Sequence, residues 1–129
     1  MIGSAFNDIL VGGGNPSGSV LTGGAGRDIL IAGTTPSTLY GGDGEDLLIG
    51  GYTDYNTDET ALETVMAEWS RTDADYDTRV STLLNGLLAG KVHGNGGPNG
   101  LYGQGDRDLF FGRDIDLTDA VAGEVFVNL

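Results

Sequence analysis

The stretch GGAGRDILI, residues 23–31, is followed eighteen residues later by GGDGEDLLI, residues 41–49. Each copy joins a glycine-rich turn to an aspartate and then to a short aliphatic segment. Repetition at a short fixed period is typical of stacked repeat folds, in which each unit buries its apolar side against its neighbours. A nine-residue spacing of apolar residues extends the pattern along the chain: Leu21, Leu30, Leu39, Leu48, and again Leu101 and Phe110.

These periodic residues lie in very short strand-like segments, and the turns between the segments are of two kinds. A middle residue that faces a shared core, flanked by two that face outward, is the pattern of a short β-strand. Turns 3–8, 23–28, 41–46 and 103–108 end in aspartate, whereas turns 14–19 and 32–37 end in serine and contain proline. The alternation predicts a mostly β fold, a parallel β-roll (right-handed solenoid) in which two units make one coil.

Every second turn of such a roll lies on the same edge, so Asp28 and Asp46 are expected to stack there, one coil apart. Stacked like charges repel one another. A divalent cation between coils would reverse the sign of that interaction, and glycine would let backbone carbonyls complete an oxygen shell. The alternative is a glycine-rich roll without metal, which would leave the stacked acids without a counter-charge.

Both nonapeptides match G-G-x-G-x-D-x-U-x, and the chain resembles the repeats-in-toxin family, with its hemolysin-type calcium-binding repeats, over about residues 1–51 and 98–112. The resemblance implies calcium between neighbouring coils, with Asp8, Asp28, Asp46 and Asp108 as carboxylate ligands. It implies carbonyl ligands in the two complete turns: Gly23, Gly24, Ala25, Gly26, Gly41, Gly42, Asp43 and Gly44.

The first and last acidic turns depart from this motif. Ser4 and Phe6 replace glycines in the first, and Gln104 and Asp106 replace glycines in the last. Asp106 can adopt a left-handed conformation because a short polar side chain tolerates it. We therefore expect about two regular sites and one irregular site on the acidic edge, by this motif count. The serine edge, with Ser19 and Ser37, is expected to bind no metal.

The repeat stops near residue 52 and resumes near residue 98, and this insertion has helical character. Residues 56–70 predict one helix capped at Thr57, and residues 73–86 predict a second that stops at Asn85-Gly86. Residues 94–100, GNGGPNG, predict a flexible return loop. The apolar stripes of the two helices are Ala61, Leu62, Val65, Met66 and Trp69, and Tyr76, Val80, Leu83, Leu84 and Leu87.

One sheet of the predicted roll would present a contiguous apolar outer face, which should not stay bare in water. We expect the two helices to pack on it; burial against another domain or a second copy is the alternative. The residues concerned are Ile9, Val11, Ile29, Ile31, Leu47, Ile49, Leu109 and Phe111. The tail, about residues 113–129, is expected to be a C-terminal cap with acids at Asp114, Asp116 and Asp119.

Composition excludes several classes of function. The 129 residues include 19 acids and 6 bases, a formal charge of −13, which disfavours nucleic acid and anionic membranes as partners. Cysteine is absent, so disulfides and thiolate zinc sites are excluded. No apolar run reaches the ~20 residues of a membrane span, and residues 1–12 do not read as a secretory signal. The chain enters directly into a repeat, as a fragment of a longer protein would.

The sequence thus predicts a single domain, residues 1–129, with no enzymatic activity: His93 is the only histidine and G-x-S-x-G is absent. The resemblance implies a secreted, extracellular or cell-surface calcium-binding module. Such a module would fold on calcium binding and stabilise or assist export of a larger chain, with other domains and type I secretion machinery as partners. A carbohydrate-binding or adhesion module is the alternative, in which Tyr52 and Tyr55 could stack on a glycan or simply pack their loop.

Overall fold

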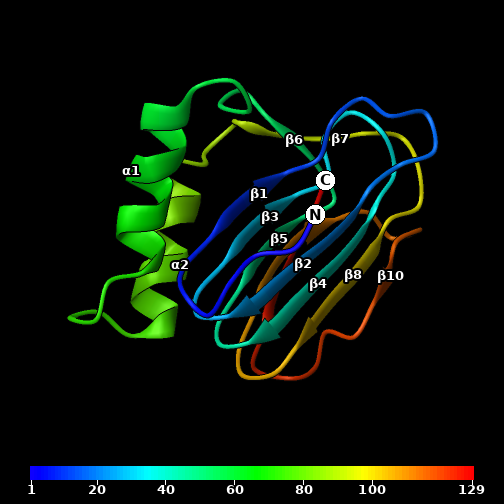
Figure 1. Cartoon of the computed structure of the whole chain (residues 1–129). Helices are drawn as coiled ribbons and strands as arrows, with labels where there is room; N and C mark the ends of the chain where they lie inside the picture. Colours follow the sequence, from blue (N-terminus) through cyan, green and yellow to red (C-terminus); the bar gives the residue numbers. More distant parts are fainter.

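The computed structural model describes residues 1–129 as two parallel sheets, a helical hairpin and a small antiparallel arm (Figure 1). A five-stranded sheet has the order β1-β3-β5-β9-β11, and a four-stranded sheet has the order β10-β8-β4-β2. The five strands are β1 (Ile9–Val11), β3 (Ile29–Ile31), β5 (Leu47–Ile49), β9 (Leu109–Gly112) and β11 (Val125–Asn128). The four are β2 (Val20–Ala25), β4 (Thr38–Asp43), β8 (Gly100–Gln104) and β10 (Leu117–Thr118).

The chain alternates between these two sheets, and the alternation follows the nine-residue period. Each strand of one sheet is followed along the repeats by a strand of the other. The register is the predicted one, since Leu30 pairs with Leu48 in the five-stranded sheet and Leu21 pairs with Leu39 in the four-stranded sheet. The middle residues therefore stack in rows between the sheets. That inner core consists of Leu10, Leu21, Leu30, Ala32, Leu39, Leu48, Leu101 and Phe110.

The insertion packs on the outer face of the five-stranded sheet, as the apolar pattern predicted (Figure 1). Helix α1 (Glu59–Trp69) buries Leu62, Val65 and Trp69 there. Helix α2 (Tyr76–Asn85) buries Tyr76, Val80 and Leu83 in the same cluster. The sheet side of the cluster is Ile29, Ile31, Leu47, Ile49, Leu109 and Phe111, with Ile9 and Val11 half-buried beside it.

Several details of the insertion differ from the prediction. The α1 cap is Asp58 rather than Thr57, because the Asp58 carboxylate accepts the Ala61 N–H at 3.0 Å. Leu87 packs against the cluster half-buried, as predicted, and Leu88, beyond the end of α2, is buried there as well, which was not predicted. An antiparallel pair, β6 (Gly51–Thr53) and β7 (Val92–Gly94), closes the base of the insertion and was not predicted.

The C-terminal tail adds strands to both sheets. β10 pairs with β8, and β11 pairs with β9, both in parallel. Phe126 stacks on Phe110 with ring centroids 6.3 Å apart, so it covers the end of the inner core. The C-terminus is therefore one more strand of the five-stranded sheet.

Candidate functional site

The four aspartates predicted as ligands lie in one row at the edge where the chain passes into the five-stranded sheet. Each precedes a strand of that sheet directly: Asp8 precedes β1, Asp28 β3, Asp46 β5 and Asp108 β9. Those strands are hydrogen-bonded neighbours, so the row follows from the register. The prediction that the aspartates stack on a single edge is confirmed.

The aspartates are joined by a ladder of backbone-to-carboxylate hydrogen bonds. The Asp8 N–H donates to Asp28 Oδ1 at 2.8 Å, and the Asp28 N–H donates to Asp46 Oδ1 at 2.8 Å. The Asp46 N–H donates to Asp108 Oδ1 at 2.7 Å, across the whole insertion. One oxygen of each of the last three carboxylates is therefore used to fix its orientation.

The second oxygen of each of these three carboxylates is buried and has no hydrogen-bond partner. Asp28 Oδ2, Asp46 Oδ2 and Asp108 Oδ2 are the only buried side-chain nitrogen or oxygen atoms of the chain in this condition. All three residues are 0% exposed. An unpaired carboxylate oxygen excluded from water is energetically unfavourable unless a counter-charge faces it. These three atoms therefore indicate a site for a positively charged ligand.

Burial and mutual repulsion shift the acidity of the row. Desolvation, reinforced by the charges of neighbouring acids, raises the pKa of Asp46 to about 8 and that of Asp108 to about 7. Desolvation, with the charge of Asp8, raises the pKa of Asp28 to about 6. The row therefore resists carrying full negative charge at neutral pH unless positive charge is supplied.

Glycine is required beside each carboxylate because the backbones approach closely. A Cβ on Gly23 would collide with the Asp28 carboxylate and would lie 2.6 Å from the Gly41 carbonyl oxygen. A Cβ on Gly41 would collide with the Asp46 carboxylate and would lie 2.8 Å from the Gly103 carbonyl oxygen. Beside Gly23 and beside Gly41, a carboxylate oxygen thus lies close to a carbonyl oxygen of the next acidic turn.

Turn conformation also follows the motif. Gly24 and Gly42 have φ of 118° and 111°, values that L side chains rarely adopt. In the last turn Gln104 and Asp106 have φ of 76° and 65°, and they are the only non-glycine residues with positive φ. The predicted left-handed Asp106 is confirmed, and its carboxylate accepts the Gly44 N–H at 3.0 Å.

Several other predicted ligands already accept hydrogen bonds within the chain. Asp8 is half-buried, and its Oδ2 accepts hydrogen bonds from the Ser4 N–H at 2.6 Å and the Ser4 hydroxyl at 3.0 Å. The carbonyls of Gly42 and Asp43 accept from Gly105 and Gly26 at 2.9 Å and 3.0 Å. No three acidic or histidine side chains converge on one point. Any cation at this edge must therefore draw much of its oxygen shell from the backbone.

The serine edge carries a second ladder, which the sequence analysis missed. The Ser19 N–H donates to Ser37 Oγ, the Ser37 N–H to Asn99 Oδ1, and the Asn99 N–H to Asp116 Oδ1, at 3.0, 2.9 and 2.7 Å. Asn99 is 2% exposed, and its Nδ2 also donates to the Gly50 carbonyl at 3.0 Å. The return loop thus ends in a buried, hydrogen-bonded asparagine.

The remaining candidate residues have structural partners. Trp69 is 0% exposed and belongs to the core, as predicted. The Tyr55 hydroxyl donates to the Leu87 carbonyl at 2.7 Å, which favours loop packing over stacking on a glycan. Tyr52 lies 5.2 Å from the His93 ring, and His93 Nε2 lies 2.9 Å from an Asp54 carboxylate oxygen.

Comparison with known families identifies the repeat. Residues 1–15 and 20–51 match the RTX calcium-binding nonapeptide repeat, in four copies. The match contains the turns that end at Asp8, Asp28 and Asp46, while the turn that ends at Asp108 lies outside it. Searches of curated proteins and of solved structures returned no match. None of the helices is long and apolar enough to cross a membrane.

Proposed function

Since the chain carries RTX calcium-binding nonapeptide repeats, which bind calcium, we propose that it is a non-catalytic calcium-binding module of a secreted protein. Its folding would be completed by calcium outside the cell, where it would stabilise or assist export of a larger parent chain. The two alternating sheets would form a right-handed parallel β-roll. The whole of residues 1–129 would be one domain, with residues 52–98 as an insertion and residues 113–129 as a cap.

One observation carries the proposal: three fully buried carboxylates, stacked in a row, each keep one oxygen without a partner. The donor set consists of oxygens only, which is the chemistry that Ca²⁺ prefers, at six to eight ligands. Asp28, Asp46 and Asp108 would supply the carboxylates, and Asp8 the first one at the open end. The carbonyls of Gly23, Gly24, Ala25, Gly26, Gly41, Gly42, Asp43 and Gly44 are the proposed backbone ligands.

Charge links binding to folding. A bound Ca²⁺ supplies two positive charges between carboxylates that otherwise repel one another across each gap. Without it, the buried row opposes the folded state, because desolvated acids favour the protonated form. Because the ladder exists only when the coils stack, binding free energy becomes folding free energy. The low calcium concentration inside cells would keep the chain incompletely folded until it is exported.

The test is a calorimetric titration of Ca²⁺ into chelator-stripped protein, with circular dichroism recorded in parallel. We expect saturable binding, with a gain of β signal and a more compact chain. Asp28→Asn should weaken binding strongly, whereas Asp114→Asn, an exposed acid whose side chain has no hydrogen bond, should not. A stripped chain whose dichroism and compactness are unaffected by millimolar Ca²⁺ would remove the basis of the proposal.

A carbohydrate-binding or adhesion role remains the second candidate, on the outer face of the four-stranded sheet. Tyr40 and Tyr102 stack there with ring centroids 5.4 Å apart, beside a polar groove that includes Ser19, Thr38 and Asn99. A glycan array probed with and without calcium would distinguish the two roles. Binding that is lost in Tyr102→Ala but retained in Asp28→Asn would support the second.

A further inference from the structure

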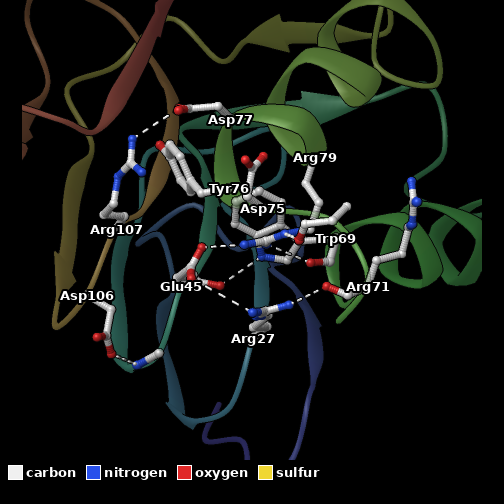
Figure 2. A network of polar contacts seen from close by, with 12 residues as sticks. Arg27, Glu45, Trp69, Arg71, Asp75, Tyr76, Asp77, Arg79, Asp106 and Arg107 are labelled. Atoms are coloured by element: carbon white, nitrogen blue, oxygen red, sulfur yellow. Dashed lines mark hydrogen bonds and ion pairs between the residues drawn. The ribbon is translucent and has the colours of Figure 1, made fainter.

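The residue that precedes each of three ladder aspartates contacts the helical insertion or the loop that joins its helices. Arg27 Nη1 donates to the Arg71 carbonyl at 2.7 Å. Glu45 is bonded to both helices, and Arg107 lies 4.1 Å above the Tyr76 ring. These residues occupy the same position of the nonapeptide in successive acidic turns. Figure 2 shows their side chains beside the residues of the insertion that they contact. The insertion therefore contacts the acidic edge at the residue directly before each of these three aspartates.

The contacts at Glu45 are the most extensive. The Trp69 Nε1–H, at the end of α1, donates to the Glu45 backbone carbonyl at 2.9 Å. The Arg79 guanidinium, from α2, pairs with the Glu45 carboxylate. Glu45 is thus held by its main chain and its side chain at once, and the next residue along the chain is Asp46.

Arg79 is itself fixed on every side. Its side chain is 1% exposed, it donates to the carbonyls of Trp69 and Ala74 at 2.9 and 3.3 Å, and it lies 4.8 Å from the Trp69 ring centroid. A buried guanidinium that lost its carboxylate would be left as an unpaired charge, which is strongly unfavourable. The pair therefore holds the turn of Glu45 against α2.

The same helix also reaches the next coil. The Tyr76 hydroxyl donates to the Asp108 carbonyl and accepts the Val125 N–H at 2.9 Å. Tyr76 is 4% exposed, so this contact is excluded from water. Helix α2 consequently fixes the main chain at Asp46, through Glu45, and at Asp108, which are two adjacent members of the ladder.

We propose that Arg79 is a positioning residue for the calcium edge: by holding Glu45 it sets the turn that aims the Asp46 carboxylate into the gaps on either side. This inference rests on the proposed function. It adds that the insertion raises the calcium affinity of the sites on either side of Asp46. Docking of the helices and closure of the acidic turns are then a single coupled event. The gap between Asp8 and Asp28 lies farther along the row and depends on Arg79 least.

The experiment measures ion binding by the full chain with Tb³⁺ as a luminescent substitute for Ca²⁺, excited through Trp69, the only tryptophan. Arg79→Met and Glu45→Gln are compared with the double variant. Each single change should raise the concentration for half-maximal sensitised emission by about tenfold or more, a change equivalent to about 1.4 kcal/mol. The loss in the double variant should be clearly smaller than the sum of the two single losses, because the two residues share one ion pair; Glu45 also pairs with Arg27, at 3.8 Å.

Arg71→Gln is the matched control: it removes the same charge from the insertion, but its side chain pairs only with Glu68 and Asp73. It should leave the titration unchanged. If Arg79→Met does not fold at saturating Ca²⁺, Glu45→Gln carries the test alone. The inference is overturned if the single variants bind as tightly as the parent while helix stability falls, or if their effects add. A parent chain that binds neither Ca²⁺ nor Tb³⁺ would instead overturn the proposed function, and the inference with it.

Discussion

Acid should stabilise the calcium-free fold, in contrast to its usual effect on proteins. Asp28, Asp46 and Asp108 have raised pKa values in the folded chain because they are desolvated. The folded state without calcium therefore binds protons that the unfolded chain releases. Its stability from these groups is complete below about pH 4, the ordinary aspartate range, and is lost as the pH rises through about 6 to 8.

Asp46 gives the size of the effect. Its pKa rises from 3.8 to about 8, so between pH 8 and pH 5 it titrates in the folded chain but stays ionised in the unfolded chain. One unit of pKa shift corresponds to about 1.4 kcal/mol, so Asp46 alone should raise the free energy of unfolding by on the order of 4 kcal/mol over this range. With an m-value of about 2 kcal/mol/M, the urea midpoint should move up by roughly 2 M.

The assay is urea unfolding in excess chelator at several values between pH 8 and pH 5, followed by Trp69 fluorescence; the midpoint is expected to be lowest at pH 8, where the calcium-free chain is least folded. His93→Gln serves as the background, so that the histidine contact with Asp54 does not contribute. Asp46→Asn should make the profile shallower, with Asp28 and Asp108 still contributing. A midpoint that stays constant or falls on acidification would show that the row is not desolvated in the folded chain.

Calcium binding should depend on pH in the opposite direction to the stability of the calcium-free fold. The carboxylates must release their protons before they can bind the cation, so affinity should fall from pH 8 to pH 5 and binding should release protons. Calorimetry in two buffers of different ionisation enthalpy counts those protons. The opposite pH trends of the calcium-free and calcium-bound forms distinguish this account from a general acid sensitivity.

Three further outcomes are expected. Asp28→Ala should abolish binding in both gaps that this residue borders, which calorimetric stoichiometry would detect; loss of only one site would contradict the shared ladder. Gly23→Ala should lower calcium affinity and the thermal midpoint, because its Cβ would collide with the Asp28 carboxylate, whereas Gly13→Ala, with nothing within 4 Å, should be neutral. Asn99→Ala should lower the free energy of unfolding by about 1–3 kcal/mol with or without calcium, because the buried Gly50 carbonyl loses a donor; a loss that appears only in calcium would be inconsistent with this.

The repeats were predictable from the sequence because they encode their structure locally. A nine-residue period fixes which residue faces inward, so the inner core and the row of aspartates followed from counting. The two helices followed from apolar spacing, and their position followed from the sheet face that would otherwise be bare. For the repeats and the helices themselves, a local pattern in the sequence contained the information.

What escaped prediction depends on contacts across the insertion. Arg79 lies on the buried side of α2, but only the fold brings it to Glu45, thirty-four residues earlier. Asn99 takes the place of Ser37 in the next coil, and the long excursion hides that register in the sequence. Both are polar residues whose burial makes sense only when their distant partner is known.

The two edges of the fold differ in whether the side-chain oxygens of their ladders find hydrogen-bond donors, and this difference favours a cation on the acidic edge. Both run a ladder in which a backbone N–H donates to a side-chain oxygen one coil away. On the serine edge the carboxylate that ends the ladder, Asp116, is satisfied, since its second oxygen accepts the Arg113 N–H at 2.9 Å. Asn99 also brings two amide protons of its own, one of which the Gly50 carbonyl accepts. On the acidic edge the corresponding oxygens of Asp28, Asp46 and Asp108 meet no donor. The same backbone arrangement therefore satisfies its carboxylate oxygens with protein donors on the serine edge. On the acidic edge it leaves three carboxylate oxygens unpaired, and calcium would supply the positive charge that they need.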